Sequence, residues 1–412
     1  MPAITKTFSP APKVISSIVP ASSGTKRIAS VDVYRGLVML LMMAEVLSFK
    51  RVSDTLPNSS FWKFMAYNQD HVAWTGCSLH DLIQPSFSFL VGVAVPFSIA
   101  GRLAKGATFN ALLRHTIVRS FILIVLGIFL RSMGAKHTYF TFEDTLTQIG
   151  LGYTFLFLLG FCSTRTQIIT LVCILASYWA LFAFYPLPNA SFDYTSAGVT
   201  ANWEHNFNGF AAHWNKNTNA AWAFDKRFLN LFPREHPFTN NEGGYATLSF
   251  IPTLGTMILG LFAGTILKQD HIAATRVKWF VYTGIGLLLS GLIIHFTGIN
   301  PIVKRIWTPA WVLFSGGCCF LLLAFFYSVI DVYKYRKWSF PLMVIGMNSI
   351  AAYVMAHTIT SFIKSSFSIH LGQHYNQVFG EAYASLVSGG LVLLVDFLIL
   401  YWMYKRKIFL KI

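Results

Sequence analysis

Two histidines and two carboxylates lie together immediately before a long apolar run. Asp70 and His71 are adjacent, as are His80 and Asp81, and residues 82–100 that follow carry no charge. A histidine can accept and return a proton near neutral pH, and a neighbouring carboxylate can orient it. Ionisable groups at the mouth of a membrane-type segment are costly and usually functional. We therefore expect His71, oriented by Asp70 or Asp81, to be an acid–base centre, with Asp81 the carboxylate counted among the catalytic residues; a lone exposed histidine without a role is the competing interpretation.

The first apolar run contributes further candidates. Glu45 lies deep in it, where a carboxylate needs a partner or a water-filled cavity, so it is a proton relay, a substrate ligand or a packing partner. Asp32 and Arg35 are three residues apart and share one helical face. They form either a structural ion pair or a phosphate-facing arginine held by a carboxylate. Trp74, beside His71, is a candidate substrate contact.

A basic cluster follows the second apolar run. It consists of Arg102, Lys105, Arg114, His115 and Arg119. Membrane topology alone explains such a cluster, because lysine and arginine accumulate in cytoplasmic loops. An anionic cosubstrate such as a nucleotide would also use it.

Glycines interrupt two later segments beside polar residues. Glu242 precedes two glycines, and Gly346 with Asn348 breaks a late apolar run that also contains His357. Glycine permits tight turns and close ligand approach. We expect Asn348, or backbone amides near these glycines, to donate hydrogen bonds to negative charge that develops on a substrate, and Glu242 and His357 to contact substrate. A buried, hydrogen-bonded histidine is the plainer explanation of His357.

The composition indicates an all-α polytopic membrane protein. The 412 residues are 54% hydrophobic and only 12% charged, with a mean hydropathy of +0.54. Soluble proteins carry about 25% charged residues. The alternating segments of a membrane β-barrel are absent. The net charge of +16 is better explained by basic cytoplasmic loops than by nucleic-acid binding, so no nucleic-acid partner is expected.

We expect about ten membrane-spanning helices with both termini in the cytoplasm, since lysine and arginine are denser on that side of the alternation. The expected spans are 31–49, 82–101, 114–133, 145–163, 167–185, 247–267, 277–298, 307–330, 340–361 and 382–404. Residues 1–25 are a disordered cytoplasmic tail, and residues 26–412 form one transmembrane domain.

The outer loops are expected at residues 50–81 and 187–246. The second is rich in asparagine and contains Trp203, Trp214 and Trp222. These residues suit sugar binding, although tryptophan at a membrane interface explains them as well. The five cysteines show no zinc spacing, so no metal site is expected.

Five stretches together resemble the heparan-α-glucosaminide N-acetyltransferase family of transmembrane acyltransferases and its bacterial relatives. They are Arg27–Gly36, His71–Gly92, Leu146–Leu156, Glu242–Gly264 and Gly346–Tyr353, in the family's order. The resemblance covers almost everything after residue 26.

The resemblance implies that acetyl-CoA is supplied from the cytoplasm and that the acetyl group reaches an amino sugar or glycan on the far side. The family's active-site histidine falls on His71, as base or acetyl carrier. Arg35, with Asp32, and the basic residues Arg102, Arg114 and Arg119 would bind CoA phosphates. A bacterial inner membrane is the expected location, and the oligomeric state stays open, a homodimer included.

Two departures from the family pattern lie near this histidine. The family often has an asparagine where this chain has Glu45, and an aromatic or small residue where it has His80. The acceptor and the acyl group therefore need not be those of the family. The alternative function is a proton-coupled transporter or flippase of a sugar-like substrate, in which Glu45, His71 and His357 relay protons.

Overall fold

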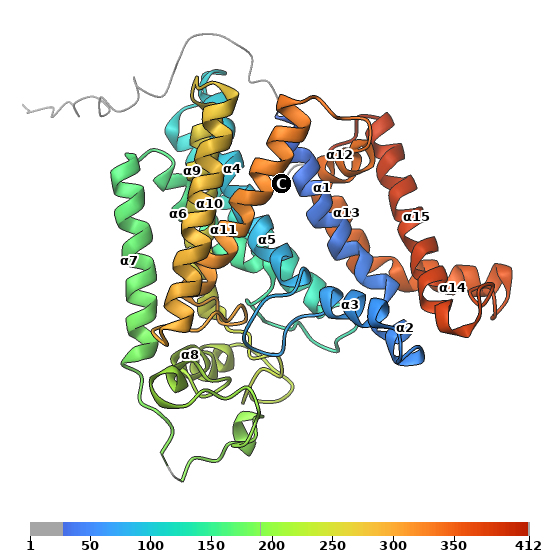
Figure 1. The fold of residues 1–412 in the computed structure, drawn as a ribbon, viewed down its shortest axis with the longest axis horizontal. Helices are drawn as coiled ribbons and strands as arrows, with labels where there is room; N and C mark the ends of the chain where they lie inside the picture. Colours follow the sequence, from blue (N-terminus) through green and yellow to red (C-terminus); the bar gives the residue numbers. More distant parts are fainter. Residues whose placement is uncertain (1–27, 190, 411–412) are drawn as a thin grey trace, which may run out of the picture.

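The computed structural model describes residues 28–189 and 191–410, and helices dominate this part of the chain (Figure 1). The expected tail 1–25 lies outside the described residues. The α-helices are α1 (Ala29–Met43), α2 (Phe49–Thr55), α3 (Ser60–Gln69), α4 (Ile83–Leu103), α5 (Phe109–Ser132), α6 (Thr145–Leu159), α7 (Thr164–Ala183), α8 (Ala220–Phe228), α9 (Phe250–Lys268), α10 (Ala273–Phe296), α11 (Pro309–Phe326), α12 (Phe340–Met347), α13 (Ser349–Thr358), α14 (Thr360–Leu371) and α15 (Ala384–Lys405).

Seven helical segments within the described ranges are long and apolar enough to cross a bilayer. They are His80–Leu103, Phe109–Ser132, Thr164–Ala183, Thr247–Lys268, Ala273–Phe296, Pro309–Val332 and Glu381–Lys405. An eighth is counted if α12 and α13, bent by 81°, form one broken span. The protein is therefore an integral membrane protein, and the bend confirms the expected interruption at Asn348.

The two other expected spans correspond to α1 and α6, which have only 15 residues each. A straight crossing needs about 20 residues. A 3₁₀ turn, η2 (Ala44–Leu47), continues α1 and ends at Ser48, whose φ of 49° is left-handed. The total of ten spans and the cytoplasmic location of both termini stay predictions.

The α4–α9 pair packs with its backbones in close contact. A Cβ added to Gly92 would lie 2.0 Å from the carbonyl oxygen of Met257, and one added to Gly260 would lie 1.9 Å from that of Phe89. Only glycine fits at these two positions. Small residues at a helix interface permit this approach in membranes, where dispersion and packing drive association.

Successive helices run in alternating directions, so the C-terminal ends of some helices lie beside the N-terminal ends of others. The end of α1, the start of α4, the end of α5 and the start of α6 gather at one side, called here the His71 end. Arg102, at the end of α4, and Arg114, near the start of α5, lie at the opposite side, called here the basic end.

The expected outer loops contain ordered structure. Residues 50–81 contain α2, α3 and a 3₁₀ turn, η3 (His80–Leu82), and residues 187–246 contain α8, which lies below α7 and α10 in Figure 1. A small separate core holds these loops. Trp74 donates its Nε1–H to the carbonyl of Trp214 at 3.1 Å, and Tyr178 donates its hydroxyl to the carbonyl of Ile306 at 2.9 Å.

Candidate active site

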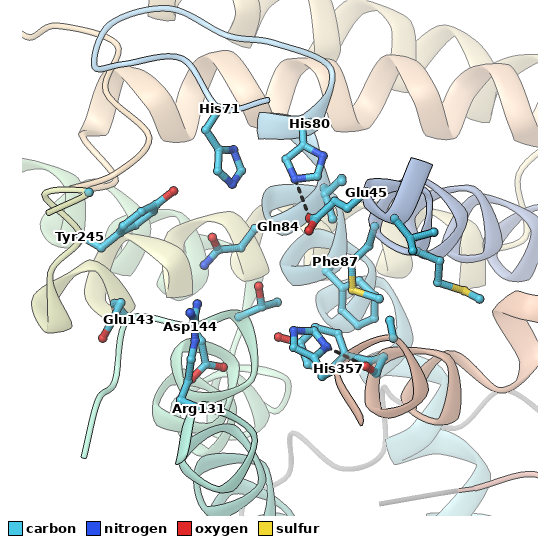
Figure 2. Close-up of a pocket in the computed structure, with 18 of the residues that line it drawn as sticks. Glu45, His71, His80, Gln84, Phe87, Arg131, Glu143, Asp144, Tyr245 and His357 are labelled. Carbon is cyan, nitrogen blue, oxygen red and sulfur yellow. Dashed lines mark hydrogen bonds and ion pairs between the residues drawn. The ribbon is translucent and has the colours of Figure 1, made fainter. Parts of the chain in front are cut away.

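A cavity of about 1030 Å³ lies at the His71 end of the bundle (Figure 2). Its lining combines η2, η3, the helix ends around them, α13 to α15 and the loops before α6, α9 and α11. Of the residues expected to carry chemistry or bind substrate, Glu45, His71, Glu242 and His357 line it. The volume is that of a small-molecule site.

His71 lies between a carboxylate and an ammonium group. Its Nδ1 is 2.8 Å from Oδ1 of Asp81, and the Nζ of Lys304 is 3.2 Å from the same oxygen. The Lys304 Nζ is also 3.0 Å from His71 Nδ1 and 3.5 Å from Nε2. Because an ionised carboxylate only accepts hydrogen bonds, Nδ1–H of neutral His71 donates to Asp81. Nε2 then carries the lone pair that can take a proton, with the Lys304 Nζ 3.5 Å from it, and Lys304 also hydrogen-bonds to Asp81.

Two loops distant in sequence are tied together to create this arrangement. Thr75 and Val303 form an isolated antiparallel bridge, and the backbone N–H of Gly76 donates to the carbonyl of Ile302 at 3.2 Å. These contacts align the segment after His71 with the segment that carries Lys304. Lys304 thereby reaches a residue 233 positions away in the chain.

Arg305 joins a third loop to the same group. Its guanidinium donates to the carbonyls of Gly243 at 2.9 Å and Val72 at 3.1 Å, and it lies 5.0 Å from the ring centre of Tyr245. Tyr245 in turn presents its ring to His71, with centroids 6.4 Å apart. The loop that contains Glu242 is therefore held against the histidine.

Asp81 is almost completely buried, at 1% exposure. Besides His71 and Lys304, its carboxylate accepts hydrogen bonds from the Ser78 backbone N–H and hydroxyl, both at 3.0 Å, and from the Val72 N–H at 3.3 Å. A buried charge needs such compensation. The network fixes the carboxylate, and the carboxylate fixes the His71 ring.

Burial and Lys304 set the electrostatics of the pair. Burial lowers the pKa of His71, Lys304 lowers it further, and the hydrogen bond to Asp81 opposes both. Burial also lowers the pKa of Lys304 to about 8, against the attraction of Asp81. At neutral pH His71 is therefore a neutral imidazole beside a cationic lysine, the state that a general base requires.

A second carboxylate–histidine pair faces the same cavity. Oε1 of Glu45 lies 2.8 Å from Nε2 of His80, and the rings of His71 and His80 are 4.6 Å apart between centroids (Figure 2). His80 and Asp81 are neighbours on η3, so one short turn contributes to both pairs.

Asn348 lies outside this site, which corrects its expected role as an oxyanion donor. Its amide donates to the carbonyl of Ile408 at 2.9 Å, and its side-chain oxygen accepts from the N–H of Leu410 at 3.1 Å. It therefore holds the C-terminal segment and does not line the cavity.

Trp74 and His357 also require comment. Trp74 is completely buried in the core of the outer loops and does not line the cavity, so its expected role as a substrate contact is replaced by a structural one. His357 lines the cavity, with its Nδ1 2.8 Å from the carbonyl of Tyr353 and its ring stacked on that tyrosine.

The expected phosphate-binding residues do not surround a preformed nucleotide pocket. Arg35 contacts Asp32 at 3.3 Å, and Arg119 donates to the hydroxyl of Tyr153 at 2.9 Å. Arg102 lies 3.0 Å from His115 beside a cavity of about 10 Å³, which holds about one water. Arg114 is exposed. Arg102 is about 33 Å along the helix from His80 and marks the far end of the bundle with Arg114, whereas Arg35 and Arg119 lie near the middle of α1 and α5.

Sequence reasoning missed several cavity residues, of which Lys304 is the most important. Tyr245, Gln84, Arg131 and Glu143 also line the cavity. Burial raises the pKa of the Glu143 carboxyl and of the Tyr245 hydroxyl. The signal for Lys304 was two adjacent basic residues directly before an apolar run, which the positive-inside rule does not favour in an outer loop.

The arrangement has the parts for transfer of an acyl group: an oriented imidazole, a cation beside it and a large polar cavity. No cluster of three or more histidine, cysteine, aspartate or glutamate side chains within residues 28–189 and 191–410 has metal-binding geometry.

Two curated proteins are similar to almost the whole chain. The heparan-alpha-glucosaminide N-acetyltransferases of Mus musculus and Homo sapiens are each 23% identical to it over 428 aligned residues, which cover 95% and 94% of the chain. The aligned region spans 61% of the mouse protein and 60% of the human one, so the chain corresponds to about three fifths of their length. No protein-family model matches the chain. The chain is a distant relative of the heparan-alpha-glucosaminide N-acetyltransferases.

Proposed function

We propose that this protein is a transmembrane acetyltransferase that moves an acetyl group from acetyl-CoA to the amine of an amino sugar or glycan at the His71 end. The observation that carries the proposal is the His71–Asp81–Lys304 group, of which His71 and Lys304 line a cavity of about 1030 Å³. The names of the two distant relatives supply the reaction class.

In this mechanism His71 acts through its Nε2. As the amine nitrogen attacks the acetyl carbon and the C–S bond of the thioester breaks, Nε2 takes a proton from that nitrogen and passes it to the leaving thiolate. Asp81 holds the ring and stabilises the imidazolium that forms, through the 2.8 Å contact at Nδ1. If His71 instead carries the acetyl group, the same free Nε2 is the atom that becomes acylated.

Lys304 provides positive charge where the reaction develops negative charge. Its ammonium lies within 3.5 Å of both ring nitrogens of His71, so the thioester oxygen and sulfur of a substrate at Nε2 fall near it. A fixed cation in a buried site stabilises such charge at little reorganisation cost.

For the donor, we propose entry from the basic end. Arg35, Arg102, Arg114 and Arg119 would attract the phosphates of CoA, although the cavity beside Arg102 is too small to enclose a nucleotide. The phosphates would therefore first bind at the surface of this end, and the donor would then move inward, past Arg119 and Arg35, for its thioester to reach His71. The N-terminus and the basic end would then face the cytoplasm, and in a bacterium the membrane would be the inner one.

The test is acetyl transfer by the purified protein in detergent, with labelled acetyl-CoA and glucosamine. Wild type should form N-acetylglucosamine, and His71→Ala should lose at least about 100-fold in rate. His205→Ala is the matched control, because His205 is a partly exposed loop histidine that pairs with Glu204 and does not line the cavity. Label on His71 in the absence of glucosamine would identify an acetyl carrier.

Two results would refute the proposal. Equal rates for wild type and His71→Ala would show that His71 is not the active site. If the protein neither binds acetyl-CoA nor transfers the acetyl group, the proposed reaction is refuted. The second result would favour the proton-coupled transporter, whose assay is substrate uptake into vesicles under a pH gradient.

A further inference from the structure

The pair formed by Glu45 and His80 has no role in the mechanism above, although it lines the same cavity as His71. The two side chains come from different elements: Glu45 from the 3₁₀ turn after α1, and His80 from the turn before α4. Their contact of 2.8 Å is as short as that between His71 and Asp81.

The exposure of the two side chains indicates which one meets a substrate. The His80 side chain is 7% exposed, whereas the Glu45 side chain is 57% exposed and borders the cavity. The inner imidazole holds one carboxylate oxygen, and the rest of the carboxylate faces open space. A carboxylate–imidazole contact this exposed adds little to stability, so packing alone is a weak reason for it.

Transfer to an amine needs a second base. An amino sugar arrives near neutral pH largely as an ammonium ion, R–NH₃⁺, which has no lone pair for attack. It must lose one proton to become R–NH₂ and a second after its nitrogen bonds to the acetyl carbon. Only the second proton is consumed by the leaving thiolate, so the first needs another acceptor.

His71 is poorly suited to take both protons. Lys304 lies 3.0 Å from its Nδ1, and burial together with this cation lowers its pKa. Once protonated for the first step, His71 would have no lone pair left for the second.

We propose that Glu45 and His80 are this second proton acceptor: Glu45 binds the ammonium group of the acceptor, and the pair removes its first proton before His71 acts. The inference rests on the proposed acetyltransferase function. The step is R–NH₃⁺ plus the pair giving R–NH₂ plus the protonated pair, with no bond to carbon formed or broken. The carboxylate of Glu45 and the neutral imidazole of His80 share this proton across their 2.8 Å contact, so the pair gains one positive charge.

The proposal assigns different roles to the two residues. Glu45 touches the substrate and is catalytic; His80 is a positioning residue that holds the carboxylate and shares its proton. The titratable and charged groups around them are His71, Asp81, Lys304 and His357.

The experiment compares two acceptors. Glucosamine is largely an ammonium ion at pH 7, whereas O-methylhydroxylamine is a neutral amine there and needs no first deprotonation. We expect Glu45→Gln to lower kcat/KM for glucosamine by about 10-fold at pH 7, because only about a tenth of such an amine is neutral there, while changing that for O-methylhydroxylamine only slightly. His80→Gln, which keeps a hydrogen-bond donor, should show the same acceptor dependence with a smaller loss.

The pH profile gives a readout that a structural role would not move. Raising the pH should restore glucosamine transfer in Glu45→Gln, because the free amine fraction increases. Asp54→Asn is the matched control. The Asp54 side chain is 63% exposed on α2, so removing its carboxylate should leave the protein behaving as wild type.

Equal losses with both acceptors, or no loss with either, would overturn the inference while leaving the proposed function intact. If wild type acetylates neither amine, the proposed function fails, but the role of Glu45 can still be tested by measuring ligand binding. Glu45→Gln must then weaken the binding of glucosamine but not of glucose, and unchanged glucosamine binding would overturn the inference.

Discussion

Replacing Lys304 with methionine should move the pH dependence of the reaction in a defined direction. Lys304 is 4% exposed and lies 3.0 Å from Nδ1 of His71. Its ammonium disfavours the imidazolium, so the folded protein holds the pKa of His71 below the ordinary value, with burial as the larger cause. Without this charge, and with Asp81 unopposed, the pKa of His71 must rise.

The structure sets a minimum for this rise. Two unit charges 3.0 Å apart in a water-like medium interact by about 1.4 kcal/mol. One pKa unit corresponds to about 1.36 kcal/mol, so the shift is at least about one unit. A protein interior screens less than water, so the true value lies above this minimum.

The assay is kcat/KM for acetyl transfer to O-methylhydroxylamine as a function of pH, since this acceptor needs no first deprotonation. His71 must be neutral to act, so in wild type the rate rises with pH through its lowered pKa. It then falls above about pH 8, where Lys304 loses its proton. In Lys304→Met the acid limb should move up by at least about one unit, and the fall near pH 8 should disappear.

Two variants separate charge from structural damage. Lys304→Arg keeps a cation and should leave the acid limb close to that of wild type. Lys364→Met removes a lysine from the lining of the same cavity and should shift the limb much less. Breaking a buried ion pair costs about 3–5 kcal/mol, so thermal unfolding must show that Lys304→Met is folded at the assay temperature. An acid limb that stays in place, or moves down, would refute the reasoning.

Three further predictions follow from the contacts. Asp81→Asn should lower kcat/KM by about 100-fold or more without loss of acetyl-CoA binding, because the ring of His71 loses the acceptor that fixes its tautomer. Gly92→Ala should lower the free energy of unfolding by about 1–3 kcal/mol, measured by thermal unfolding in detergent, since its Cβ would meet the Met257 carbonyl at 2.0 Å. Asn348→Ala should leave kcat unchanged and expose the C-terminal segment to protease, because its amide holds Ile408 and Leu410; a large fall in kcat would restore it as a catalytic candidate.

Periodicity and composition predicted most of the fold correctly because long apolar runs follow directly from bilayer thickness. They do not decide whether a short helix crosses the bilayer. The expected spans 31–49 and 145–163 overlap the 15-residue helices α1 and α6, so these two spans stay predictions. Sequence hydropathy does not register the turn at Ser48, whose left-handed backbone ends the first helical segment.

Some residues of the candidate site could be predicted from the sequence and others could not. His71, Asp81 and Glu45 could be proposed from the sequence, because a charge near an apolar run is costly and stands out. Lys304 could not be assigned, because its proximity to His71 depends on a bridge between Thr75 and Val303 that no local pattern encodes. Asn348 was misassigned for the opposite reason: a polar residue at a helix break suits a ligand site, yet its partner is the chain's own C-terminal backbone.

The cavity's two surfaces fit the two reactants of an acetyl transfer. Along α1, Met39 is six residues before Glu45, which places it about 9 Å deeper, and Phe87 is at a similar depth on α4. At this depth Met39 and Phe87 line the cavity together with the buried Asp396, and the methionine, which adapts to irregular shapes, suits an acyl group. The rim carries Glu45, Glu242 and neighbouring asparagines, which suit hydroxyl groups and an ammonium ion. His71 lines this cavity with both surfaces, so the polarity of the walls would itself orient acyl donor and amine toward its Nε2.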